Sequence, residues 1–553
     1  MKFEDVIFNR PYLGLIPAAF LLLLGLDWTV LIDWDENIYA EVTRRMVEDG
    51  EYLILSANGQ PFAEKPPFYF WIMSLWFHLF GPTEFAARLT SALPALVLIV
   101  ILFLAGRRLG GRMLGLLWAG VYAFGFGPLL SARMAVIDHM FNMYIALAAL
   151  LLYFYEDEYG RYRAGEFDRA RYWWYLLGAA VVMGVAVLTK GPLGGVIPLV
   201  AFGSLKLIRR SPGINIGHFA VCGVLSLSVA LSWYLINYIV QGDKFIEGFA
   251  KFQGLLFSKP LDGHDGPFFF HVLVLLLGFF PWTPLLYLWR DRERRRAILS
   301  SDFGHIVFWA LGWILFVQVL FAFVSTKLPH YSASMYIPLS LLVALVLQRK
   351  QGEGGGIGPV LLAVMVLYGV VLGLVFAVVP YYMDAINIER GFVMYDRIEP
   401  ADLAFLPGVF LVLAVLGAAH FFFRARVLAG VLAGAIFMGA WSVATWGLFF
   451  PQFSRYNQGP VMHLMHKAYA AGGDLALYRY LSFAAMFYGK KDILVLHSYK
   501  FEGDLERLKQ PGPRDLYVVA PAKTRPELEH WFPLLEHVED AGMLSMFVLP
   551  AAR

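Results

Sequence analysis

The chain has 553 residues, of which 59% are hydrophobic and 16% are charged, and its mean hydropathy is +0.60. Soluble domains carry about 25% charged residues. This composition therefore excludes an ordinary soluble protein and predicts an all-α domain that crosses a membrane many times. The net charge of +3 does not favour a nucleic-acid partner, and the single cysteine excludes an intramolecular disulfide.

Apolar segments that could cross a bilayer recur through residues 1–449. A helix needs roughly 20 apolar residues to span the hydrocarbon. The sequence predicts about thirteen spans, near 11–32, 86–105, 113–130, 140–155, 174–189, 192–208, 216–236, 269–289, 304–324, 330–348, 358–380, 403–423 and 427–449. The first lacks a small-residue cleavage site, so we expect it to be retained rather than removed as a signal peptide.

The segments between the predicted spans differ in charge from one side of the membrane to the other. Cytoplasmic loops carry an excess of Lys and Arg. One side collects most of these residues, among them Lys2, Arg107, Arg108, Arg290, Arg292 and Arg349. We therefore expect a cytoplasmic N-terminus, two long outer loops (33–85 and 237–268) and an outer C-terminal region.

Residues 450–553 change character and predict a small soluble α/β domain. Strand-like segments occupy 474–481, 492–498, 515–521 and 544–550. Helix-like segments occupy 482–489 and 524–538. Roughly 100 residues suffice for a modest core.

The first outer loop opens with three acids, Asp33, Asp35 and Glu36. Apolar residues then recur every four positions up to Gly50, which predicts an amphipathic helix on the membrane surface. Helix capping could explain the acids, since a helix N-terminus favours negative charge. For Asp33 this explanation is as good as a functional one. For Asp35 and Glu36 together, where a span meets water, we favour a function.

Later in the same loop, Glu64 and Lys65 stand directly before two prolines. A residue before proline is pushed out of the helical region, so Lys65 is expected to be extended. Adjacent residues of an extended chain face opposite ways. Glu64 and Lys65 would then serve two different partners, unless both simply point to water.

Ionisable residues also gather at the outer ends of later spans. Such groups at membrane depth are functional candidates, although a lysine can also extend to the interface. Several cations near one face predict an anionic ligand, and phosphate suits both Lys and Arg. The candidates are Arg133, Asp138, Lys190, Lys327, His330 and Tyr331. In the second long loop, His264 could hold zinc with a carboxylate from elsewhere, or be structural.

Several motifs in order carry a resemblance to a known family. They are DWDENIYAEVTRRMVEDGEYL at 33–53, NGQPFAEKPPFYFW at 58–71, GPTEFAARL at 81–89, ARMAVIDH at 132–139, TKGPLG at 189–194, GHDGPFFFHVLVLLLGFFPW at 263–282 and STKLPHY at 325–331. With these motifs the chain resembles the GT-C-type membrane glycosyltransferases of the protein O-mannosyltransferase superfamily. Within it, the chain looks most like the bacterial lipid A aminoarabinose transferases.

The resemblance implies transfer of a sugar from undecaprenyl phosphate, with inversion, at the periplasmic face of the bacterial inner membrane. The implied sugar is 4-amino-4-deoxy-L-arabinose, the acceptor is lipid A or another envelope molecule, and no nucleotide cofactor is expected. Asp35, with Glu36 beside it, matches the catalytic position. Lys65 and Tyr331 match residues near the carrier phosphate. Glu64 and His264 match two residues that share a zinc ion.

Other functions stay open at this point. A related enzyme could use another sugar or mannosylate proteins. A transporter or flippase would need inverted repeats and broken helices at the membrane midplane, and the sequence shows no repeat. A non-catalytic scaffold would not explain why the polar motifs collect on one side.

Overall fold

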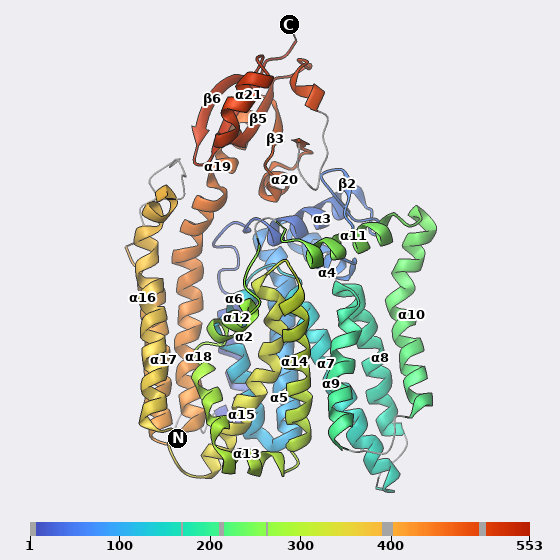
Figure 1. Cartoon of the computed structure of the whole chain (residues 1–553), viewed down its shortest axis with the longest axis vertical. Coiled ribbons are helices and arrows are strands. Elements are labelled where there is room, and N and C mark those ends of the chain that lie inside the picture. Colours follow the sequence, from blue (N-terminus) through green and yellow to red (C-terminus); the bar gives the residue numbers. More distant parts are fainter. Residues whose placement is uncertain are drawn as a thin grey trace.

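The computed structural model describes residues 7–10, 12–166, 170–209, 215–261, 264–389, 402–496 and 505–552. A bundle of long helices forms the lower part of the molecule in Figure 1. A layer of shorter helices lies across its upper end, and a small sheet domain stands above that layer. The all-α membrane domain with a C-terminal α/β domain is thus confirmed.

The bundle consists of α2 (Tyr12–Leu23), α5 (Glu84–Ala123), α7 (Asp138–Arg163), α8 (Ala170–Lys190), α9 (Leu193–Arg209), α10 (Ile216–Gln241), α14 (Gly304–Phe323), α15 (Tyr336–Gly352), α16 (Pro359–Glu389), α17 (Leu406–Phe423) and α18 (Val427–Ala444). By length and composition, eight helices in the described part could cross a membrane, or nine if one bent pair forms a single span. Each of the thirteen predicted segments overlaps a helix, but a count of thirteen crossings is not confirmed.

Helix α5 explains part of this difference, because it holds two predicted spans, 86–105 and 113–130. The backbone leaves the helical conformation at Gly110 and at Gly111, whose φ of 82° favours glycine. Beyond this break the two halves fold back on each other. A Cβ on Gly106 would lie 2.8 Å from the Cα of Gly115. Glycines therefore permit both the turn and the close approach.

Two predicted spans are interrupted. The segment 269–289 divides into α12 (Phe270–Gly278) and the 3₁₀ helix η1 (Thr283–Arg290), which meet at an angle of 103°. The segment 11–32 is helical only to Leu23 and continues as turns. Two buried arginines, described below, bind the carbonyl groups of those turns in place of helical hydrogen bonds.

The layer above the bundle contains α3 (Asp35–Asp49), α4 (Phe68–Phe80) and α11 (Lys244–Ser258), and α6 (Phe126–Ser131) lies below it beside α12. The 3₁₀ helix η2 (Pro329–Met335) directly precedes α15, and α13 (Arg292–Leu299) lies at the opposite end of the bundle. As predicted, α3 ends at Gly50 in a left-handed conformation. Its position differs from the prediction, because it is buried against α4 and α20 rather than lying on an open surface. The short strands β1 (Ser56–Ala57) and β2 (Gln60–Pro61) form a hairpin at Asn58 and Gly59, as the Asn-Gly pair favours.

The C-terminal sheet has the strand order β4-β3-β5-β7-β6, with β4, β3 and β5 parallel and the other two pairings antiparallel. Its elements are β3 (Asp474–Tyr478), α20 (Phe483–Gly489), β4 (Leu494–Leu496), η4 (Leu505–Leu508), β5 (Leu516–Pro521), η5 (Ala522–Thr524), α21 (Arg525–Trp531), β6 (Glu536–Ala541) and β7 (Leu544–Leu549). The four predicted strands and the helix at 482–489 are found, although residues 497–498 lie outside the described part.

Two boundaries of the sequence analysis are wrong. The helix expected over 524–538 ends at Trp531, because Pro533 cannot continue it, and the chain then forms β6. The boundary expected at 449–450 lies inside a continuous helical run of α18, the π-helical turn η3 (Thr445–Phe449) and α19 (Phe450–Ala470). That run connects the bundle to the sheet, and one face of the sheet shares an apolar core with α3 and α4, including Val42, Phe70, Val519 and Met546.

Candidate active site

A cavity of about 580 Å³ lies between the first loop (residues 33–85), α6, α11, α12 and η2. Nine of the residues singled out from the sequence line it, namely Asp33, Asp35, Glu36, Glu64, Lys65, Lys190, His264, His330 and Tyr331. They come from segments almost 300 positions apart (33 to 331). The fold therefore brings together most of the predicted site at one end of the bundle.

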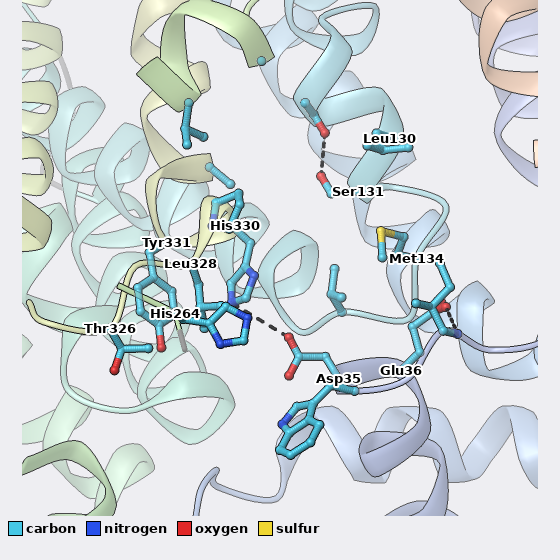
Figure 2. A pocket seen from close by; sticks show the side chains of 18 of the residues that line it. Asp35, Glu36, Leu130, Ser131, Met134, His264, Thr326, Leu328, His330 and Tyr331 are labelled. Carbon is cyan, nitrogen blue, oxygen red and sulfur yellow. Dashed lines mark hydrogen bonds and ion pairs between the residues drawn. The ribbon is translucent and has the colours of Figure 1, made fainter. Parts of the chain in front are cut away.

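Asp35 lies in the first turn of α3, where a helix favours an acid. Its side chain is 33% exposed, and Oδ2 lies 3.9 Å from Nε2 of His330. Figure 2 shows the two side chains pointing toward one another across the cavity, with His264 and Tyr331 beside His330. Asp35 can therefore contact a molecule in the cavity through an oxygen that the protein leaves accessible.

Glu36 lies next to Asp35 but is used differently. Its carboxylate accepts hydrogen bonds from Nε and Nη2 of Arg88, at 2.9 Å each, and from the backbone N–H groups of Ile32 at 2.8 Å and Ala135 at 2.6 Å. The side chain is 1% exposed, and Figure 2 shows it directed away from Asp35. The prediction of a catalytic role for Glu36 is therefore replaced by a positioning role.

Arg88 and Arg133 form a buried arginine network behind the cavity, together with Glu36 and Trp446. Arg88 donates to the carbonyls of Leu26, Thr29 and Val30, and Arg133 donates to those of Leu21 and Leu24. Both guanidinium groups lie 5.2 Å from the ring of Trp446. Arg133 was expected to bind phosphate, but it is fully buried and does not line the cavity. Its donors hold the turns after α2 instead.

Lys190 reaches the cavity from the end of α8, where a cation is favoured and Gly191, with a φ of 103°, ends the helix. It forms an ion pair with Asp138, in the first turn of α7, at 2.5 Å. Its Nζ also lies 5.7 Å from the centre of the Tyr331 ring. Asp138 does not line the cavity, so its expected contact with substrate is replaced by orientation of Lys190.

Lys327 also differs from the prediction. Its Nζ donates to the carbonyls of Phe321 and Ala322, at 3.0 and 2.8 Å, and so caps the C-terminal end of α14. The side chain is buried and does not line the cavity, although its neighbours Thr326 and Leu328 do. Lys327 therefore lies near the site in the sequence but does not face the cavity, where a phosphate would bind.

The remaining cations make the cavity suitable for an anion. Lys65 and Lys190 are both close enough to act electrostatically on Asp138. Nζ of Lys65 lies 5.1 Å from the ring of Phe252 on α11. The rest of the wall is largely apolar and includes Phe126, Leu130, Met134, Val274 and Leu277. This combination fits an amphipathic ligand with an anionic head and an apolar chain.

Glu64 and His264 line the same cavity, but the described residues contain no group of three or more His, Cys, Asp or Glu side chains that could hold a metal ion. Zinc in proteins usually has three or four protein ligands. Nδ1 of His264 lies 3.1 Å from the carbonyl of Leu261. The protein donors alone do not fit zinc, so we derive no step through a metal.

Sequence reasoning missed three residues of this region. Tyr39 and Phe252 line the cavity, and Arg88 binds Glu36. Only Arg88 left a usable signal, because a charged residue within a long apolar segment needs a buried partner or a function. Tyr39 and Phe252 resemble ordinary core aromatics in the sequence.

Comparison with known proteins agrees with this architecture. A family model described as dolichyl-phosphate-mannose-protein mannosyltransferase matches residues 64–234. An undecaprenyl phosphate-alpha-4-amino-4-deoxy-L-arabinose arabinosyl transferase of Edwardsiella ictaluri is 29% identical over 325 residues, which cover 58% of this chain and 56% of the relative. An uncharacterized protein of Aquifex aeolicus is 29% identical over 339 residues, which cover 60% of this chain and 62% of that relative. The chain thus matches less than two thirds of these relatives' lengths.

Among solved structures, ArnT from Cupriavidus metallidurans bound to undecaprenyl phosphate superimposes with a TM-score of 0.77 at 18% identity. The superposition covers 98% of both chains, so the shared fold includes the C-terminal domain. The apo state of the same protein gives a TM-score of 0.76. These findings confirm the resemblance of the chain to the protein O-mannosyltransferase superfamily and, within it, to the lipid A aminoarabinose transferases.

Proposed function

We propose that the protein is an inverting membrane glycosyltransferase that moves a sugar from undecaprenyl phosphate to an acceptor in the cell envelope. The observation that carries this proposal is the single cavity that joins Asp35 to Lys65, Lys190, His330 and Tyr331 beside an apolar wall. The names of the similar proteins support a lipid-phosphate sugar donor.

The cavity suits the chemistry of such a donor. Transfer breaks the bond between the anomeric carbon and the phosphate oxygen, and that oxygen keeps the electron pair. Lys65 and Lys190 would stabilise the charge that grows on the leaving phosphate. Tyr331, whose ring lies near Lys190, could donate a hydrogen bond to the same group. The apolar wall would hold the first part of the polyprenyl chain.

The part played by Asp35 depends on the acceptor. A hydroxyl acceptor must lose a proton as its oxygen bonds to the anomeric carbon, and Asp35 could take that proton as a general base. A phosphate acceptor is already ionised at neutral pH and needs no base. Asp35 would then orient the sugar, and a sugar that carries an amine would form an ion pair with it. His330, 3.9 Å away, would hold Asp35 in place.

The finer assignment is 4-amino-4-deoxy-L-arabinose as the sugar and lipid A as the acceptor. The names of the similar proteins support this sugar, and lipid A as the acceptor rests on the family resemblance alone. The same cavity chemistry would serve another sugar or a protein acceptor. The orientation proposed from the loop charges puts the N-terminus in the cytoplasm, and the cavity and C-terminal domain in the periplasm of a bacterial inner membrane.

Mass spectrometry of lipid A from cells with and without the protein tests this assignment. A lipid A that gains the mass of one aminopentose only when the protein is present would support sugar and acceptor together. Unchanged lipid A, with transfer to another envelope molecule, would overturn the acceptor. No transfer from any undecaprenyl-phosphate sugar by the purified protein would overturn the function.

Zinc at Glu64 and His264 remains a separate proposal, because the family resemblance implies it and the two side chains share the cavity. It would need further ligands from water or from the bound phosphate. Metal analysis of the purified protein tests it. About one zinc per chain that is lost in Glu64→Ala and His264→Ala would support the site, and zinc-free active protein would overturn it.

A further inference from the structure

The C-terminal domain (residues 474–552) contacts the first loop at the residues directly before Asp35. One oxygen of Asp33 accepts a hydrogen bond from Oγ of Ser482 at 2.6 Å. The other accepts from the backbone N–H groups of Phe483 and Ala484, at 3.1 Å each, in the first turn of α20. Asp33 therefore caps a helix, as helix capping was one explanation for the acids of this loop. The helix that it caps is α20, about 450 residues further along the chain, and not α3.

Further contacts hold the backbone on the other side of Asp33. The N–H of Asp33 donates to Oε1 of Gln458 on α19 at 2.8 Å, and Nε2 of Gln458 donates to the carbonyl of Leu31 at 2.7 Å. The hydroxyl of Tyr488 on α20 accepts from the N–H of Leu31 at 2.8 Å and donates to Glu84. Residues 31–33 are thus held by side chains that follow residue 449.

The next residue connects these contacts to the cavity. The ring of Trp34 meets the ring of Phe483 edge to face, with centroids 5.1 Å apart. Trp34 and Asp35 both line the large cavity. Phe483 lines a smaller cavity of about 190 Å³, which shares Glu64 with the large one. The C-terminal domain therefore lines a smaller cavity that adjoins the site.

We propose that the C-terminal domain positions the catalytic segment, with Asp33 bound to Ser482 and the first turn of α20 as the contact that sets where Asp35 points. The inference rests on the proposed function for the catalytic meaning of Asp35. Asp33 also lines the large cavity, but both of its carboxylate oxygens accept hydrogen bonds from Ser482 and the first turn of α20, so we assign it as a positioning residue.

Loss of this contact should affect turnover more than donor binding. The displacement of a reacting group by about 1 Å can cost about 10²-fold in rate. The cations that would bind the donor phosphate, Lys65 and Lys190, lie on other segments and keep their places. We therefore expect a lower kcat with a nearly unchanged KM for the lipid donor.

Ser482→Ala tests the proposal without altering any residue of the large cavity. Ser545→Ala is a matched control, because Ser545 is another buried serine that donates to an aspartate, Asp540, but does so inside the C-terminal domain. Two measurements are made on the full-length protein in detergent. They are hydrogen exchange of the backbone amides of residues 31–36, and turnover of an undecaprenyl-phosphate-linked aminoarabinose with lipid A.

We expect Ser482→Ala to exchange faster at residues 31–36 and to lose about tenfold in kcat, while Ser545→Ala matches the wild type in both. A Ser482→Ala protein with wild-type exchange and wild-type kcat would overturn the proposal. So would one that melts earlier but keeps its kcat, since the contact would then only stabilise the fold. If the wild type transfers no sugar, the proposed function fails, and the exchange measurement alone decides whether the contact holds the segment.

A second pair of variants covers the case in which Ser482→Ala does not fold. Asp33→Asn keeps an oxygen that can accept from Phe483 and Ala484, whereas Asp33→Ala keeps none. Positioning predicts that Asp33→Asn retains kcat within about threefold and that Asp33→Ala does not. Equal activity of the two variants would overturn it.

Discussion

The cavity wall and the arginine network behind it are both built from charged residues of one apolar chain, and they differ in what those charges contact. On the wall, Asp35, Lys65 and Lys190 face a space that a ligand can enter. In the network, Glu36 and Arg88 bind each other and the backbone turns after α2. Charged residues only a few positions apart in the sequence thus face a ligand-binding space in one region and stabilise the fold in the other.

Removing one charge from the cavity wall tests most directly whether the wall residues carry out the transfer. Asp35→Asn keeps the shape and removes the negative charge, so we expect sugar transfer to fall by about 10³-fold or more with the protein still folded. Transfer is measured with purified protein and lipid donor, and folding by thermal unfolding in detergent. Wild-type transfer by Asp35→Asn would remove the site assignment.

Removing a charge from the network should act on stability instead. Arg88→Met leaves Glu36 buried without its ion pair, and breaking a buried pair costs about 3–5 kcal/mol. We expect a large fall in unfolding temperature. The double variant Glu36→Gln with Arg88→Met should recover part of it, because the side chain at position 36 is then no longer a buried carboxylate that has lost its arginine. An Arg88→Met protein as stable as the wild type would contradict the structural role.

A second wall residue gives a smaller expected effect. Lys190→Met removes one of the cations proposed to face the phosphate, and we expect kcat/KM to fall by about 10²-fold. Raising the salt concentration should weaken donor binding less in this variant than in the wild type. Unchanged kcat/KM would mean that Lys190 serves only Asp138.

The pH dependence of stability tests the contact at Asp33. Burial raises the pKa of this carboxyl to about 6, and its hydrogen bonds to Ser482 and to the N–H groups of α20 offset part of that rise. A raised pKa means that the folded protein binds the proton more tightly than the unfolded chain. Stability should therefore rise as the pH falls through about 6, by about 1.4 kcal/mol between pH 7.5 and pH 5.

The control for this prediction is Asp33→Asn, which cannot titrate. The difference in unfolding free energy between the wild type and Asp33→Asn should change with pH by the same amount. A difference that stays constant from pH 5 to pH 7.5 would contradict the raised pKa.

The smallest effect is expected at Lys327, which the sequence places beside the site and the structure turns away from it. Lys327→Met removes the cap of α14 and should lower stability by about 1 kcal/mol. Transfer should stay within about twofold of the wild type once the protein is folded. A loss of transfer as large as that of Lys190→Met would contradict the conclusion that Lys327 stabilises the fold and does not contact the ligand.

The sequence by itself determined the class of fold and identified the ionisable residues that line the cavity. Hydropathy located the helical segments, because burial in a membrane demands long apolar stretches. Local chemistry located the Asn58–Gly59 hairpin, the end of α3 at Gly50 and four of the five strands of the C-terminal sheet. Motif resemblance placed Asp35, Lys65 and Tyr331, which the structure brings to one cavity.

Only the tertiary structure decided which charged residues face that cavity. Arg133, Lys327 and Asp138 are ionisable like the wall residues but do not line the cavity, and Glu36 lines it with a carboxylate that is bound to Arg88. Partners such as Arg88 for Glu36, or Ser482 for Asp33, are 52 and 449 positions away. Residue type and spacing reveal that a charge needs a partner. Whether that partner is a ligand or another part of the chain depends on contacts that form when distant segments pack together.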